Sequence, residues 1–116
     1  MTTVPGRSVP IGYPWRQRLT IAGETPTFPA GIELRADLRE WRGGPVLAEM
    51  TSAAGQLVRV SDTEIDLIAP ADVTAMLRPG SALLDFVRTD LPEPEYMDIR
   101  VTLPVVEPLT PAVVTP

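Results

Sequence analysis

The chain has 116 residues, a formal net charge of −5, and no cysteine, histidine or lysine. These absences exclude a disulfide framework, a thiolate metal site, a cysteine nucleophile, an imidazole base and Schiff-base chemistry. A chain of this length forms one domain and buries about two-thirds of its unfolded surface, so it can make a core without disulfide or metal staples.

The distribution of charge and hydrophobicity argues against two classes of partner. All ten basic residues are arginines with acidic residues between them, whereas a nucleic-acid-binding surface needs clustered positive charge. No stretch approaches the run of about 20 apolar residues that spans a membrane, and residues 1–7 lack the apolar segment of a signal peptide. We therefore expect no nucleic acid, no membrane and no cofactor, and synthesis in a cytoplasm.

Half of the 14 prolines lie near the two ends of the chain, which predicts two extended arms. Residues 1–14 contain three prolines and two glycines and show no periodicity. The last residues are also rich in proline and carry no charged side chain from Pro108 onward. We predict an N-terminal arm over residues 1–14, a folded domain over 15–104 and a C-terminal arm over 105–116.

The domain opens with a strand predicted over residues 15–21, and a short extended piece follows around Phe28. The clearest strand covers residues 32–41, because apolar and charged residues alternate strictly from 32 to 39. One face of this strand is expected to meet the core, and the other to carry a ladder of opposite charges. The segment Arg42-Gly43-Gly44-Pro45 ends it.

Further short strands follow in the second half of the domain. They are predicted over residues 46–51, 56–60, 63–69, 82–88 and 96–103. After residue 69, Pro70-Ala71-Asp72 resembles the start of a short helical turn, with Asp72 placed to cap it. About seven short strands without a longer helix predict an all-β fold, an antiparallel β-sandwich, with a small barrel as the alternative.

Five acidic residues are candidates for catalysis or metal binding: Asp62, Glu64, Asp66, Asp85 and Asp90. Paired carboxylates can act as acid and base or bind calcium. However, Glu64 and Asp66 share one face of a strand and are expected at the surface for solubility, and no spacing resembles a calcium loop. No phosphate-binding loop and no activated serine motif is present. We therefore expect no catalytic, cofactor-binding or metal-binding residue, and no enzyme activity.

Five other residues are candidates for contacts with partner proteins: Tyr13, Trp15, Trp41, Leu109 and Val113. Tryptophan is enriched at interface hot spots, although the alternative is that Trp15 and Trp41 cap the ends of the core. Both arms are more apolar than solvated linkers. We expect them to dock on neighbouring subunits as extended ribbons, with folding back onto their own domain as the alternative.

Three segments carry a resemblance to a known family. They are Leu19-Thr20-Ile21-Ala22-Gly23, the alternating residues 32–39, and the stretch from Ile65-Asp66-Leu67 to residues 74–80 that introduces a strand with Asp85. With these, residues 15–106 resemble the small immunoglobulin-like domains of tailed-bacteriophage virion proteins, such as the N-terminal module of upper baseplate proteins. The sequence departs from that pattern at Phe28-Pro29-Ala30-Gly31, where relatives often have an Asp-Leu-Thr-Gly-like turn.

This resemblance implies an immunoglobulin-like sandwich and a non-enzymatic structural role in the virion. Its partners would be major capsid, neck, tail or baseplate subunits, bound as a capsid-decorating (cement) protein or as a neck, tail or baseplate accessory. A homo-oligomer or many copies in one assembly is expected. The alternative is a free-standing carbohydrate-binding or protein-binding module.

Overall fold

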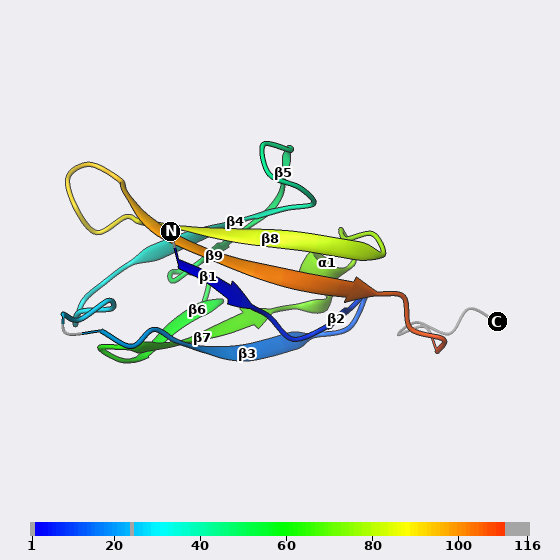
Figure 1. Cartoon of the computed structure of the whole chain (residues 1–116), viewed down its shortest axis with the longest axis horizontal. Coiled ribbons are helices and arrows are strands. Elements are labelled where there is room, and N and C mark those ends of the chain that lie inside the picture. Colours follow the sequence, from blue (N-terminus) through cyan, green and yellow to red (C-terminus); the bar gives the residue numbers. More distant parts are fainter. Residues whose placement is uncertain (1, 24, 111–116) are drawn as a thin grey trace.

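Two β-sheets pack face to face in the computed structural model, which describes residues 2–23 and 25–110 (Figure 1). The larger sheet has the strand order β1-β9-β8-β4-β5, and β2 also pairs with β9. Its strands are β1 (Thr2–Pro5), β2 (Val9–Pro10), β4 (Leu34–Arg39), β5 (Val46–Thr51), β8 (Gly80–Arg88) and β9 (Glu95–Val106). The smaller sheet has the order β3-β7-β6, with β3 (Trp15–Thr20), β6 (Leu57–Ser61) and β7 (Glu64–Ala69). The prediction of an all-β sandwich is confirmed.

The core lies between the two sheets and follows the alternation of the sequence. On β4, Leu34, Ala36 and Leu38 are buried, while the residues between them are partly exposed on the outer face. The same alternation buries Ile99, Val101 and Leu103 on β9, as their spacing predicted. Strand residues two apart point to one side of a sheet, so these two strands each supply one apolar face to the core.

The short piece expected around Phe28 is an irregular segment between β3 and β4. The Phe28 side chain is fully buried. Its backbone N–H donates a hydrogen bond to the carbonyl of Asp62 (2.8 Å), and its own carbonyl accepts one from Nε of Arg59 (2.7 Å). This irregular segment is therefore satisfied by partners near the β6–β7 turn instead of a neighbouring strand.

The chain forms one short helix among the described residues, α1 (Ala71–Thr74), between β7 and β8. The helical turn was predicted at this place, but the capping role of Asp72 was wrong. Pro70 occupies the N-cap position, and no side chain makes a capping hydrogen bond. Asp72 lies inside the first turn, past the position from which a carboxylate accepts from the free N–H groups.

The predicted N-terminal arm is corrected by the structure, because residues 2–10 belong to the sandwich itself. β1 and β2 pair in parallel with β9, and Val9 is 1% exposed in the core. Gly6, between the two strands, donates to the carbonyl of Thr102 (2.7 Å), and a Cβ there would lie 2.4 Å from Cδ2 of Leu103. Only glycine allows so close an approach.

The predicted start of the C-terminal arm is corrected in the same way. β9 continues to Val106, and Val105 is 4% exposed and pairs with Val9. The arm therefore leaves the sandwich after residue 106 instead of after 104. Part of it lies outside the described residues. Over residues 2–23 and 25–110, no helix combines the length and the hydropathy needed to cross a membrane.

Candidate functional site

The five residues predicted to contact partners do not form one site. Trp15 was wrongly predicted as a contact, because it is 6% exposed and belongs to the core. Tyr13 is half-buried, and its hydroxyl donates to the carbonyl of Thr110 (2.6 Å), so it holds the chain beyond β9. Leu109, which precedes Thr110 in the chain, is fully exposed, while Val113 lies outside the described residues. Trp41 is 55% exposed on the turn between β4 and β5.

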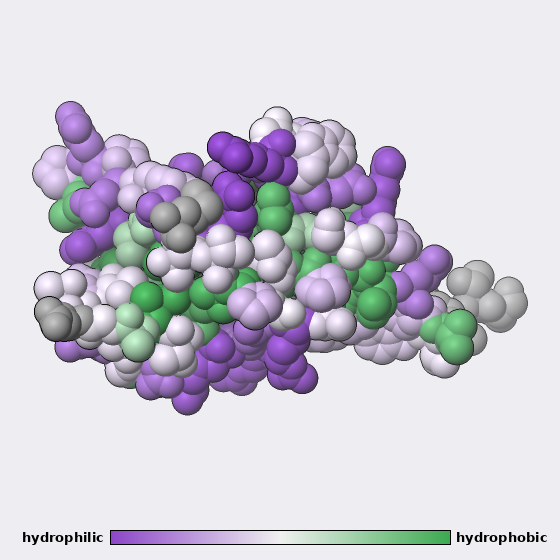
Figure 2. Space-filling model, in the orientation of Figure 1, coloured by the Kyte–Doolittle hydropathy of each residue, from purple (hydrophilic) through white to green (hydrophobic). Residues whose placement is uncertain are grey.

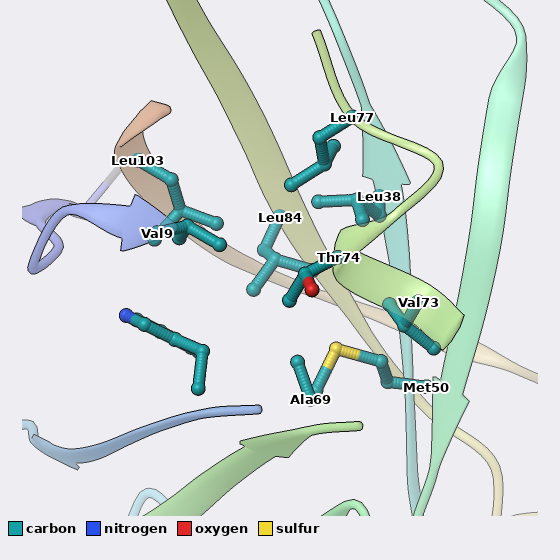
Figure 3. A pocket seen from close by; sticks show the side chains of 10 residues that line it. Val9, Leu38, Met50, Ala69, Val73, Thr74, Leu77, Leu84 and Leu103 are labelled. Atoms are coloured by element: carbon teal, nitrogen blue, oxygen red, sulfur yellow. The ribbon is translucent and has the colours of Figure 1, made fainter. Parts of the chain in front are cut away.

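A cavity in the core is too small to be a binding site. Its volume is about 10 Å³, and side chains from both sheets and α1 point toward one another around it (Figure 3). The Oγ1 of Thr74 in its wall is already used, because it donates to the carbonyl of Tyr13 (2.7 Å) and accepts from the N–H of Gly12 (3.1 Å). One further polar atom of the wall, Nε1 of Trp15, is buried without a hydrogen-bond partner among the described residues, but a water needs two or more free polar partners. This cavity is therefore a packing gap.

The outer face of the larger sheet carries a network of five charges. Across β4, β8 and β9 the register places Asp37 opposite Asp85, and Asp85 opposite Arg100. Nε of Arg100 lies 3.3 Å from Oδ1 of Asp85, and Nε of Arg35 lies 3.2 Å from Oδ1 of Asp37. Arg39 spans both acids, with terminal nitrogens 3.7 Å from Asp37 and 3.8 Å from Asp85.

This arrangement explains how two carboxylates can face each other across neighbouring strands. Like charges directly opposite in a sheet destabilise it. Three guanidinium groups offset that repulsion, and their side chains are between 18% and 37% exposed, so the pairs are only partly screened by water. The network gives the face a fixed pattern of charge on a rigid sheet.

A groove of about 510 Å³ runs over this network, between two raised walls. We define the basic wall as residues 41–44, in the β4–β5 turn, and the acidic wall as residues 93–96, in the β8–β9 loop and the first residues of β9. Both rise from the same side of the larger sheet, the acidic wall in yellow and orange and the basic wall in teal (Figure 1). Arg42, Gly43 and Gly44 line one side of the groove, and Tyr96 lines the other.

Local contacts fix the shape of the basic wall. The Trp41 ring packs so closely on Gly44 that a Cβ at Gly44 would lie 2.8 Å from its Cε2 atom. The N–H of Gly44 donates to the carbonyl of Trp41 (3.0 Å), and Nε of Arg39 donates to the carbonyl of Gly44 (3.1 Å). Gly43 has a φ of 78°, which favours glycine. Trp41 is therefore held in place although half of it is exposed.

Several donors of the groove are unused. Arg42 is exposed and has no hydrogen bond or ion pair with any residue that the structure describes. Arg100, which also lines the groove, makes its hydrogen bond through Nε, whereas the terminal nitrogens of Arg39 lie near Asp37 and Asp85. A guanidinium has five N–H donors, so Arg100 keeps terminal donors for other acceptors. These groups can receive carboxylates or other acceptors from a partner.

The outer face of the smaller sheet holds a second ion cluster. Asp66 was predicted to lie on the solvent face for solubility, and it does point outward, but it is only 6% exposed. Arg18 binds it with two hydrogen bonds (2.9 and 3.3 Å), and Arg16 with one (3.1 Å). The hydrogen bond from Arg18 is the main cause that lowers the pKa of the Asp66 carboxyl. Hydrophilic residues thus cover both outer faces, with hydrophobic ones between them (Figure 2).

The remaining acidic candidates are engaged with arginines. Asp62 pairs with Arg59, and Asp90 accepts two hydrogen bonds from Arg88 (2.8 and 3.0 Å), which lower the pKa of Asp90 to about 2. Over the described part of the chain, no three acidic side chains come together in a way that could hold a metal ion. These residues build the surface of the sandwich and form no separate site, whereas the groove is a concave feature of that surface.

The comparisons with known proteins found no match: no family model, no curated protein and no solved structure is similar to this chain. Function is therefore argued from the geometry. Sequence reasoning found Trp41 and the charge ladder of residues 33–39, but missed the groove and Tyr96. The sequence feature that could have pointed to the groove was the charge ladder of residues 33–39. Its partners Asp85 and Arg100 become visible only with the strand register.

Proposed function

We propose that this protein is a non-enzymatic structural component that binds neighbouring proteins through the outer face of its larger sheet. The observation that carries this proposal is the pair of half-exposed aromatic side chains on the two walls, Trp41 (55%) and Tyr96 (50%), beside unused arginine donors. Tryptophan, tyrosine and arginine are the residue types most enriched in interface hot spots. A contact surface built on strands also holds its geometry better than one on loops alone.

The strand order supports an immunoglobulin-like version of the sandwich. With β3 in the place of strand B, β7 and β6 take the places of E and D. In the larger sheet, β9, β8, β4 and β5 then correspond to G, F, C and C′. This correspondence agrees with the resemblance of residues 15–106 to the domains of phage virion proteins.

On that resemblance we assign the protein to a tailed-bacteriophage particle, as a capsid-decorating protein or a neck, tail or baseplate accessory. A symmetric shell or ring repeats each contact, so even weak contacts per subunit hold the assembly together. Leu109, fully exposed beyond β9, is a second apolar contact point outside the groove.

The experiment is mass spectrometry and electron cryomicroscopy of purified particles from the phage or prophage that encodes the chain. We expect many copies on the head or a few at the neck or tail. Trp41→Ala and Tyr96→Ala should lower the number of copies per particle. Met76→Ala is the matched control, since Met76 is also 55% exposed but lies between α1 and β8, away from the groove.

Absence of the chain from particles would refute the virion assignment. A second candidate function, carbohydrate binding, would then become the leading one, because Tyr96 lines a groove with hydrogen-bonding arginine and aspartate side chains. Glycan-array binding that Tyr96→Ala abolishes would support that candidate.

A further inference from the structure

The two walls of the groove carry charges of opposite sign. On the acidic wall, Glu93 and Glu95 are exposed. Glu93 makes no hydrogen bond or ion pair with the residues that the structure describes, and Glu95 has only an electrostatic attraction to Arg88, which it faces across the strands. The nearby Arg88 is already bound by Asp90 through two hydrogen bonds. The basic wall presents Arg42, which is equally exposed and unpaired among the described residues. Each wall thus offers a charge that the other could neutralise.

The walls also each carry one aromatic side chain. Tyr96 is half-exposed on the acidic wall, and Trp41 on the basic wall. The two walls rise from separate parts of one side of the larger sheet (Figure 1), and residues of both line the groove. In a twofold symmetric interface, residue i of one copy contacts residue j of the other, and j contacts i. A face with complementary ends therefore fits a second copy of itself.

We infer that this protein forms a twofold dimer in which the acidic wall of each copy lies against the basic wall of the other. The twofold axis lies in the plane of the face and perpendicular to β4, β8 and β9. Arg42 of each copy then meets Glu93 and Glu95 of its partner, and Trp41 meets Tyr96. Arginine over an aromatic ring adds a cation–π contact. The inference rests on the proposed function only in that it uses the same binding face.

The test must separate local attraction from overall repulsion. Two copies that each carry a net charge of −5 repel one another. Added salt would weaken both that repulsion and the contacts between the walls, so salt dependence alone does not decide. Reversing the charge of one wall at a time separates the two effects, because control variants can be given the same overall charge.

Sedimentation velocity over a concentration series measures the dimer of the wild-type chain and four variants. Arg42→Glu and the double variant Glu93→Arg/Glu95→Arg place like charges together, so each should weaken dimerisation by more than about tenfold in Kd. Arg78→Glu is the control for the first, and Asp72→Arg/Glu107→Arg for the second. All three control positions are exposed and lie outside the two walls.

Rescue makes the test specific. An equimolar mixture of Arg42→Glu with Glu93→Arg/Glu95→Arg restores opposite charges at both contacts. It should form a heterodimer at concentrations where each variant alone is mostly monomeric. The two tryptophans supply a second readout by nuclear magnetic resonance. The indole N–H signal of exposed Trp41 should shift with protein concentration, while that of buried Trp15 stays in place.

A wild-type chain that stays monomeric over the whole series overturns the inference, as does equal weakening by Arg42→Glu and Arg78→Glu. The outcome of the particle experiment does not depend on the outcome of the dimer test. A monomeric chain found in particles refutes the dimer and leaves the proposed function standing, whereas a dimer absent from particles does the reverse.

Discussion

At the scale of single residues, Asp66 shows that pointing outward and being exposed are different properties. Its position on β7 was correctly predicted to face away from the core, because Ile65 and Leu67 face inward. Arg16 and Arg18 on the neighbouring strand cover it, since their register places them beside Asp66. Long arginine side chains shield surface through their aliphatic stems while their charged ends stay in water.

Replacement of Asp66 by asparagine tests how much this ion cluster contributes to the stability of the fold. Asp66→Asn keeps the shape but removes the charge that three arginine hydrogen bonds recognise. We expect the free energy of unfolding to fall by about 1–2 kcal/mol, because hydrogen bonds to charged groups contribute more than neutral ones. Urea denaturation near neutral pH measures it. Asp72→Asn, at an exposed position, is the control, and equal stability of both variants would contradict the expectation.

At the scale of elements, β1 and β2 are the least predictable part of the sandwich. β1 pairs with β9 only, and most of its residues are exposed. Its attachment depends on Gly6, whose N–H donates a hydrogen bond to the carbonyl of Thr102 and whose backbone lies against the Leu103 side chain. Strands held by one neighbour open more easily than central ones.

A side chain at Gly6 should therefore loosen β1 locally. In Gly6→Ala the new Cβ meets Cδ2 of Leu103 at 2.4 Å and the Thr102 carbonyl at 3.0 Å, so the strand or the Leu103 side chain must shift. Overpacking of this kind costs about 1–3 kcal/mol. Hydrogen exchange should become faster in residues 2–6 and stay unchanged in β3 and β7. Gly23→Ala is the control, since its Cβ would lie 3.7 Å from the nearest atom. Unchanged exchange in residues 2–6 would show that the core yields instead.

At the scale of the whole molecule, two arginine–aspartate pairs in different parts of the sandwich link stability to pH. Arg18 lowers the pKa of Asp66, and Arg88 lowers that of Asp90 to about 2, mainly through hydrogen bonds. An unfolded aspartate titrates near about 3.9. Both groups therefore bind fewer protons in the folded chain over that interval. Their contribution to stability is complete above the unfolded pKa and is lost as the pH falls through the folded pKa.

We expect the free energy of unfolding to be steady from neutral pH to about pH 5 and to decline between about pH 4 and pH 2. Urea denaturation at a series of pH values measures this decline. Asp90→Asn should make it shallower, because one of the two depressed carboxyls is gone. A decline of the same slope in this variant would mean that Asp90 is not one of the groups responsible.

The sequence alone determined the fold class, most strand positions and the inward face of the clearest strands. Alternation with a period of two is a property of neighbouring residues, so it can be read without knowing which strands pair. It also placed Trp41 at the end of a charged strand, where the structure leaves it half-exposed.

Only the tertiary structure decided where the residues predicted as arms lie and which charged side chains pair with one another. Residues 2–10 pair with a strand at the other end of the chain, and no local pattern marks that partner. Asp37, Asp85 and Arg100 are also far apart in sequence, and their network exists only because the register of β4, β8 and β9 aligns them. Parallel pairing and cross-strand register depend on contacts between distant segments, and a local pattern does not encode them.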